Sequence, residues 1–144
     1  RVLFRSASCL FDQGNVDAAL AKANEGLKRA PDDAACLTVT ALAKAKQGKA
    51  AEAAELARKV AASTSEPEFL RVAGEILAGS GKHAEAISSY RRALASGYDA
   101  MTTYRLAVSL NAVGDRAGAM QAMQELQRRS PGFLNSSQWI DALR

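Results

Sequence analysis

The stretch that decides the fold spans residues 67–94 and reads PEFLRVAGEILAGSGKHAEAISSYRRAL. Gly81 divides it into two halves. On each side of this glycine the apolar and small residues recur every three or four positions: Leu70, Ala73, Gly74 and Leu77, then Ala86, Ile87, Tyr90, Ala93 and Leu94. That spacing places each set on one side of an α-helix. Glycine supplies the backbone freedom that a tight turn requires, so the stretch predicts two antiparallel helices joined at Gly81.

The same arrangement recurs along the chain. Turn glycines separated by 34, 33 and 33 residues are Gly14, Gly48, Gly81 and Gly114. Five residues after each glycine stand Ala19, Ala53, Ala86 and Ala119, and seven residues before each stand Ala7, Ala41, Gly74 and Ala107. The two helices of a hairpin approach closely only where both side chains are small. The register therefore predicts four repeats, over 1–33, 34–66, 67–99 and 100–133.

Helix-start signals agree with this register. Ser65 and Glu68 have the spacing of a capping box around Pro67, and Asp99 is placed to cap the next first helix. A final helix is expected over 134–144, with its start signals in the stretch from Asn135 through Gln138. Its apolar side carries Trp139, Ile140 and Leu143 and is expected to cover the open end of the stack.

Composition points the same way. The 144 residues include 31 alanines, only 6% aromatics and three prolines, which favours an all-α fold. Apolar residues are 48% and charged residues 24%, as in a globular protein. No apolar run approaches the roughly 18 residues of a membrane span, and no secretory signal is visible. The compartment stays open, with the cytoplasm favoured.

The net charge of +4 is spread along the chain rather than concentrated on one stretch, which argues against a nucleic-acid partner. Basic pairs recur at Lys28-Arg29, Arg58-Lys59, Arg91-Arg92 and Arg128-Arg129. We expect them late in helices, where cations complement the helix dipole; a basic ridge for acidic ligands is the alternative. Cys9 and Cys36 make no disulfide framework and are expected to be small buried hydrophobes.

The pattern resembles the tetratricopeptide repeat, whose signature is Leu-Gly or Leu-Ala in the first helix, a glycine turn, an alanine early in the second helix and a proline near the end. The fourth unit carries it as Leu106-Ala107, Gly114, Ala119 and Pro131. The resemblance implies a right-handed α-solenoid of antiparallel helix hairpins. It also implies that the first helices line a concave groove, which suits an extended peptide or a helix of a partner protein.

Within that register, the groove positions are those ten, six and three residues before each turn glycine. The predicted peptide-binding residues are Phe4, Phe11, Thr38, Leu42, Arg71, Glu75, Tyr104, Val108 and Asn111. Tyrosine and arginine often dominate binding energy at interfaces, which singles out Tyr104 and Arg71. The lysine and asparagine clamp by which one branch of the family binds chaperone tails is absent, because the corresponding places hold Phe4, Ser8, Val39, Glu68 and Val72.

Enzyme interpretations find little support. The segment Gly79-Ser80-Gly81-Lys82-His83 has neither the first glycine of a phosphate-binding loop nor the hydroxyl after its lysine. His83 is the only histidine, so a histidine-based metal site or catalytic triad has little to draw on. No catalytic residue, cofactor or metal is predicted.

The leading hypothesis is a non-catalytic module or scaffold that binds a segment of another protein. Two alternatives stay open. One is a regulatory region of a larger multidomain protein, which can include an enzyme domain; a first residue other than methionine motivates it. The other is a module for homo-oligomerisation. The identity of the partner is not encoded in these patterns.

Overall fold

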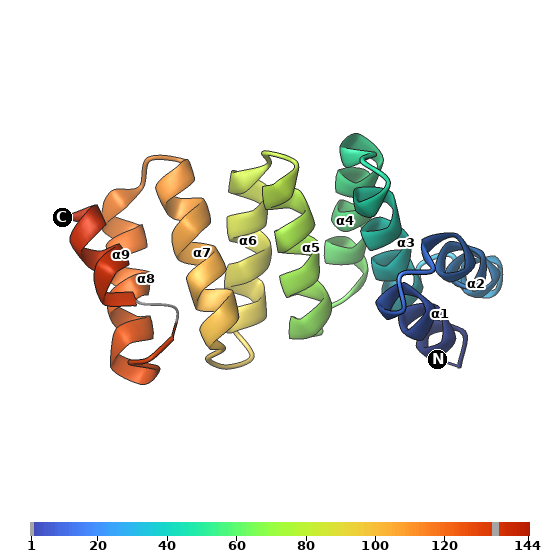
Figure 1. The fold of residues 1–144 in the computed structure, drawn as a ribbon, viewed down its shortest axis with the longest axis horizontal. Helices are drawn as coiled ribbons and strands as arrows, with labels where there is room; N and C mark the ends of the chain where they lie inside the picture. The colour runs from blue at the N-terminus through green and yellow to red at the C-terminus, as the bar shows by residue number, and fades with distance from the viewer. Residues whose placement is uncertain (1, 134–135) are drawn as a thin grey trace.

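The computed structural model describes residues 2–133 and 136–144, and over those residues it is helical with no strand (Figure 1). The helices are α1 (Val2–Asp12), α2 (Val16–Arg29), α3 (Ala34–Lys46), α4 (Ala50–Ser63), α5 (Pro67–Gly79), α6 (His83–Leu94), α7 (Ala100–Ala112), α8 (Arg116–Arg129) and α9 (Ser136–Leu143).

The helices pair as α1 with α2, α3 with α4, α5 with α6 and α7 with α8, and each pair packs on the next. The hairpins follow one another along the long axis of the molecule, and the two termini lie at opposite ends (Figure 1). This arrangement confirms the all-α solenoid of antiparallel helix hairpins that the family resemblance implies.

All four hairpin turns use the same backbone geometry. The glycines Gly14, Gly48, Gly81 and Gly114 have φ angles of 81°, 75°, 77° and 86°. At the third turn the amide of Gly81 donates to the Ala78 carbonyl at 3.0 Å, and that of Lys82 donates to the Leu77 carbonyl at 2.8 Å. This pair of bonds ends the helix in a Schellman motif, which needs a left-handed residue and so explains the glycine.

The small residues flanking the turns are buried, as the sequence predicted. The alanines Ala7, Ala41, Ala107, Ala19, Ala53, Ala86 and Ala119 are all 0% exposed. In the third repeat the small position is Gly74, and an added Cβ there would lie 2.5 Å from the Cε1 atom of Tyr90. The hairpins therefore close over side chains that occupy almost no space.

The predicted cap at Asp99 is confirmed: its carboxylate accepts a hydrogen bond from the Thr102 amide at 2.8 Å at the start of α7. Asp33 caps α3 in the same way, by accepting from the Cys36 amide at 2.8 Å. The capping box predicted at Ser65 is wrong: Glu66 is the N-cap residue of α5, and Pro67 occupies the first turn. The predicted cap at Asn135 lies outside the described residues.

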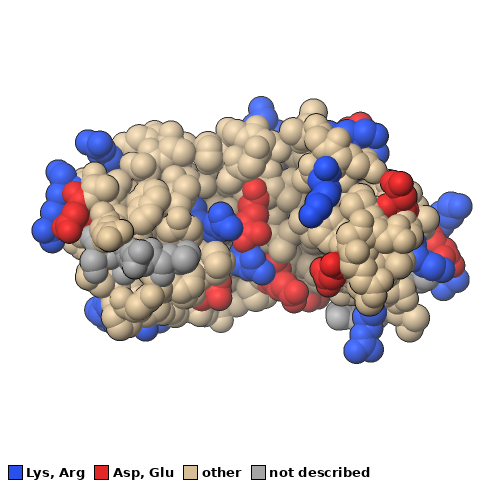
Figure 2. Space-filling model, in the orientation of Figure 1, with Lys and Arg blue, Asp and Glu red and all other residues tan. Residues whose placement is uncertain are grey.

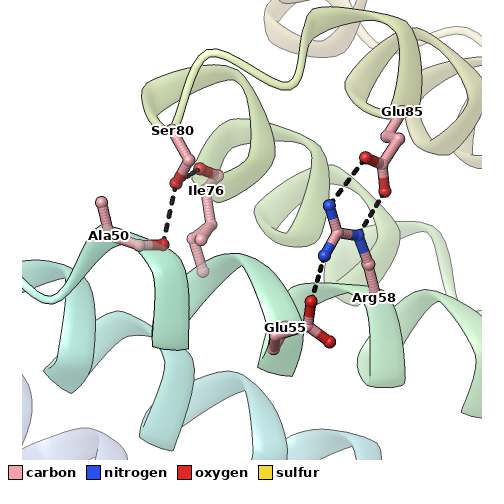
Figure 3. A network of polar contacts seen from close by, with 6 residues as sticks. All are labelled: Ala50, Glu55, Arg58, Ile76, Ser80 and Glu85. Atoms are coloured by element: carbon pink, nitrogen blue, oxygen red, sulfur yellow. Dashed lines mark hydrogen bonds and ion pairs between the residues drawn. The ribbon is translucent and has the colours of Figure 1, made fainter.

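The basic pairs divide into two groups. The pairs beginning at Lys28, Arg91 and Arg128 lie in the last turns of α2, α6 and α8, as predicted. Arg58-Lys59 does not lie in the last turn of α4. Arg58 instead forms ion pairs with Glu55 and with Glu85 of the next hairpin (Figure 3).

The cysteines also differ from each other. Cys36 is buried, and burial together with a hydrogen bond to Asp33 raises the pKa of its thiol to about 11. Cys9 is exposed, so the expectation that both are buried is wrong for Cys9. Arg5, Ser6 and Asp12, which lie one turn from Cys9 on α1, are exposed as well.

The C-terminal end of the stack is covered by α9. Ile140 and Leu143 are only 4% and 6% exposed and belong to the same core cluster as Met123 and Leu126 of α8. The last helix thus buries apolar side chains that an isolated final hairpin would expose to water. None of the described helices has the length and apolar character to cross a membrane.

The curvature of the stack follows from which helices contact each other. The first helix of each hairpin contacts the first helix of the next, as α1 does α3, α3 does α5 and α5 does α7. The second helices contact the first helix of the following hairpin instead. Because the first helices lie closer to one another than the second helices do, their side of the solenoid is concave.

Candidate functional site: the concave face

A cluster of three charged residues lies at the middle of the concave face. Arg71 and Glu75 of α5 form an ion pair of 2.7 Å, and the Nε atom of Arg105 on α7 lies 3.8 Å from the same Glu75 carboxylate. Figure 2 shows acidic and basic side chains gathered over the middle of the face seen in Figure 1. The cluster has one more cation than anion.

Local sequence explains the cluster. Arg71 and Glu75 are four residues apart, so they lie one turn apart on the same side of α5. Arg105 reaches them because α5 and α7 are neighbouring first helices. The side chains of Arg71 and Glu75 are 30% and 29% exposed and that of Arg105 is 47% exposed, so all three remain accessible to a partner.

Apolar and polar side chains flank the cluster. Leu42 of α3 lies on one side of it, and Val108 and Asn111 of α7 lie on the other; all three are partly exposed. They sit at the predicted groove positions of their helices. The middle of the face thus combines a charged centre with aliphatic surface on both sides, an arrangement that suits a segment of mixed chemistry.

A small depression adjoins the cluster where α5 begins and α6 meets α7. Its volume is about 340 Å³, and its lining includes Pro67, Glu68, Arg71, Asp99 and Thr102. Hydrogen bonding from Thr102 holds the pKa of Asp99 below its usual range, and the charge of Arg71 adds to this effect. Asp99 is therefore a carboxylate at neutral pH beside the positive end of the cluster.

Thr38 is a correction to the predicted site. It is only 5% exposed, and its hydroxyl donates to the Ala34 carbonyl at 2.7 Å. Its helix, α3, packs against α1, α2, α4 and α5. Thr38 therefore belongs to the interior and presents almost no surface to a partner.

Two of the three predicted aromatic residues, Phe4 and Tyr104, take part in internal packing. The rings of Phe4 and Phe69 meet edge to face, with centroids 5.9 Å apart. Tyr104 makes similar contacts with Phe133 and Trp139, at 6.2 Å and 6.0 Å. Both rings are still partly exposed, but each is held in place by another part of the chain.

Phe11 lies apart from the central cluster, on α1. The ammonium group of Lys46 on α3 sits 5.8 Å from the centre of its ring, within the range of a cation–π contact. The structure thus brings Leu42, Arg71, Glu75, Val108 and Asn111 into one central surface, and places Phe4, Phe11 and Tyr104 toward its ends.

Sequence reasoning missed Arg105. Its repeat position, nine residues before the turn glycine, is occupied by the buried Val39 in the second repeat and by the partly buried Val72 in the third. The equivalent residue of the first repeat is Arg5, so this position is basic in two repeats and aliphatic in the other two, and it carries no consistent polar signal. Only the side-by-side placement of α5 and α7 reveals that Arg105 shares a carboxylate with Arg71.

Comparisons with known proteins agree with this architecture. A family model described as tetratricopeptide repeat matches residues 4–67, 38–100 and 71–132. A comparison with curated proteins gives no match. Similar solved structures include YrrB, described as a tetratricopeptide-repeat protein with an unusual peptide-binding site; the TM-score is 0.84 at 15% identity, over 98% of this chain and 74% of that one.

Two further solved structures have the same fold. MamA from Desulfovibrio magneticus aligns with a TM-score of 0.82 at 19% identity, over 98% of this chain and 81% of that one. PilF from Pseudomonas aeruginosa aligns with a TM-score of 0.83 at 17% identity, over 99% of this chain and 66% of that one. At such identities the likeness concerns the fold. Because the family model spans most of the sequence, the chain belongs to the tetratricopeptide repeat family.

Proposed function

We propose that this chain is a non-catalytic protein-interaction module that binds a segment of another protein along its concave face. The observation that carries the proposal is the accessible cluster of Arg71, Glu75 and Arg105 between the aliphatic surfaces of Leu42 and Val108. Arrays of helical repeats present extended concave surfaces of this kind to partners.

In this cluster, Arg105 can give up its contact with Glu75 and bind a carboxylate of the partner instead. At 3.8 Å, the pair between Arg105 and Glu75 is long, and Arg105 is nearly half exposed. An exposed ion pair of this kind contributes little to stability, so little is lost when the guanidinium turns to another carboxylate. The planar donors of arginine match a carboxylate in two-point geometry, which favours a partner segment with an acidic residue.

The face is also preorganised. Its helices are fixed by the buried hairpin alanines and by neighbouring hairpins, so few groups need to be ordered on binding. We infer that the aliphatic side chains of the partner lie over Leu42 and Val108 while its acidic group meets Arg105. Among the related folds, YrrB is described as having a peptide-binding site, which is compatible with this role.

The proposal is tested with peptides selected from a displayed random library on the immobilised chain. The affinity of the selected peptides is then measured by fluorescence anisotropy for the wild-type chain, Arg105→Ala, Val108→Asp and the control Lys59→Ala. Lys59 is an exposed cation on the second helix α4, away from the concave face. Helicity is checked by circular dichroism, and light scattering checks that the chain does not occupy the face with a second copy.

We expect each concave-face variant to weaken binding about tenfold, equivalent to about 1.4 kcal/mol, with the control unchanged. If the selected peptides bind Arg105→Ala and Val108→Asp as tightly as the wild type while helicity is intact, the concave face is not the binding surface. Failure to select any peptide also counts against the proposal.

A further inference from the structure

Two neighbouring grooves on the convex side differ in whether side chains form bonds across them. The groove between α4 and α6 has a volume of about 320 Å³, and that between α6 and α8 has a volume of about 440 Å³. Both lie between successive second helices, with residues of α5 or α7 at the base. Because the two grooves are built from equivalent repeat positions, they can be compared residue by residue.

The α4–α6 groove is bridged by two arginines. Arg58 of α4 donates two hydrogen bonds to the carboxylate of Glu85 on α6, at 2.6 Å and 2.9 Å, with both groups directly facing each other (Figure 3). Arg92 of α6 donates in the opposite direction, to the carbonyls of Ala61 at 2.6 Å and Thr64 at 3.0 Å. The Arg58 guanidinium lowers the pKa of Glu85, so the acid is charged at neutral pH.

The α6–α8 groove has an arginine at the position equivalent to Arg58, but neither of the two bridges between the helices is present. Thirty-three residues after Arg58 stands Arg91, and thirty-three residues after Glu85 stands Gly118; both line this groove. Over the residues that the structure describes, no acidic partner of Arg91 is present. The position of Arg92 is taken by Glu125, which pairs within its own helix with Arg128 and Arg129.

The earlier interval does not repeat this situation. Between α2 and α4 the equivalent of Arg58 is Asn24, and the equivalent of Glu85 is Glu52. Glu52 pairs with Lys44 at 2.9 Å. Among the three spaces between successive second helices, only the α6–α8 groove therefore combines an arginine at the Arg58 position with no acidic residue at the Glu85 position.

The lining of the α6–α8 groove supplies an apolar floor beside the cation. Leu106 and Leu110 of α7 are 9% and 4% exposed and form the base, with the half-buried Leu94 of α6 at its side. At one end the guanidinium of Arg129 lies 4.9 Å from the centre of the Tyr98 ring. Arg91 itself is exposed and free to meet an anion from outside the chain.

We propose that the α6–α8 groove is a second docking site, which binds a short protein segment carrying a carboxylate side chain next to an aliphatic one. The partner's carboxylate takes the place that Glu85 has in the preceding groove and accepts hydrogen bonds from Arg91. Its aliphatic neighbour covers Leu94, Leu106 and Leu110. Charge complementarity selects an acidic segment over a neutral one. This site is on the opposite side of the solenoid from the concave face and is independent of the function proposed there.

The test uses nuclear magnetic resonance of the full chain with two defined peptides, acetyl-Ala-Leu-Glu-Leu-Ala-amide and its counterpart with glutamine in place of glutamate. We expect the glutamate peptide to give saturable shifts of the Arg91 Nε–H signal and of the methyl signals of Leu94, Leu106 and Leu110. Affinity is expected to fall about tenfold for the glutamine peptide and for the variant Arg91→Gln. Arg116→Gln removes an exposed arginine of α8 that does not line the groove and is expected to change nothing.

A second pair of variants restores the missing acid within the chain. Gly118→Glu is expected to pair with Arg91 and to weaken binding of the glutamate peptide about tenfold relative to Gly118→Gln, which has the same size without the charge. A Cβ at Gly118 would lie 2.5 Å from the capping carboxylate of Asp115, whereas Ala18 is accommodated at the equivalent position of α2 beside its cap Asn15. The variant Arg91→Gln leaves Gly118 unchanged, so its result does not depend on a shift of the Asp115 side chain.

Three results overturn the proposal. If the glutamate and glutamine peptides bind equally well, the carboxylate has no role in binding. If neither peptide gives a saturable shift, the groove is not a docking site. Hexanoate serves as a carboxylate with an aliphatic tail but no peptide backbone. Shifts at the groove with hexanoate and none with the glutamate peptide reject a protein segment as the occupant.

Discussion

The ring of Tyr90 on α6 fills the space in which a side chain at Gly74 on α5 would lie. An added Cβ at Gly74 would be 2.5 Å from the Cε1 atom of the ring and 2.8 Å from its Cδ1 atom. Tyr90 is fully buried, and this burial raises the pKa of its phenol above the usual value, so it is neutral at all physiological pH values. The third hairpin thus closes by matching its largest side chain with its smallest residue.

Gly74→Ala is therefore expected to destabilise the chain by about 1–3 kcal/mol, because the buried ring must shift. Chemical denaturation measures the change in the free energy of unfolding. Gly79→Ala is the matched control on the same helix, since nothing lies within 4 Å of an added Cβ there. It is expected to be neutral or slightly stabilising, by up to about 1 kcal/mol. Equal losses in the two variants argue against the contact as the cause.

The buried alanines of the second helices give an independent prediction. Ala86→Leu and Ala119→Leu place larger side chains at positions that are 0% exposed. Each is expected to cost roughly 1–3 kcal/mol of unfolding free energy through overpacking. Ala84→Leu, at an exposed position of α6, is the control and is expected to change little. An unchanged melting temperature for both buried variants contradicts the close hairpin crossing.

The turn glycines are required by backbone conformation rather than by space. Gly114 has a φ of 86°, and nothing lies within 4 Å of an added Cβ. Gly114→Ala is expected to cost roughly 1–2 kcal/mol because an L-residue is strained in the left-handed region. Gly114→Asn is expected to cost less, since asparagine tolerates that conformation better. If thermal unfolding ranks the two variants in the opposite order, the strain argument is wrong.

The N-cap of α7 predicts a specific dependence on pH. Hydrogen bonding from Thr102 lowers the pKa of Asp99 in the folded state below its unfolded value of about 3.9. Its stabilising contribution is therefore complete above the unfolded pKa and is lost as the pH falls through the folded pKa. Asparagine also caps helices and does not titrate.

We expect the difference in unfolding free energy between the wild type and Asp99→Asn to shrink as the pH is lowered from about 5 toward 2. Denaturant unfolding at a series of pH values measures it. The exposed Asp12 provides the control through Asp12→Asn. A difference between wild type and Asp99→Asn that stays constant over this range dismisses the lowered pKa of Asp99 as a source of stability.

The repeat architecture was predictable because it rests on local requirements that recur at fixed positions. The turn at Gly81 needs a left-handed residue, and the crossing at Ala86 needs a small one, whatever the rest of the chain does. Each requirement restricts the residue type at the same position of every repeat. The apolar sides of the helices and the positions of the turns were therefore predictable from these residues.

The concave face was predictable only in part, because it depends on how hairpins stack. Position ten before the turn glycine is accessible at Arg71 but buried at Thr38, on a helix against which α1, α2, α4 and α5 all pack. The ring of Phe4 meets Phe69 from the third repeat, a contact set by the curvature of the stack. Tyr104 is held by Trp139 of α9, which lies outside the repeat register altogether.

Binding along the concave face is tested by locating a bound peptide on the chain. A library-selected peptide carrying a nitroxide spin label is added to the protein, and the broadening of methyl signals is recorded by nuclear magnetic resonance. We expect strong broadening of the methyl signals of Leu42 and Val108 on the concave face and little broadening at Leu56 on α4. Broadening of Leu56 with Leu42 and Val108 unaffected contradicts binding along that face.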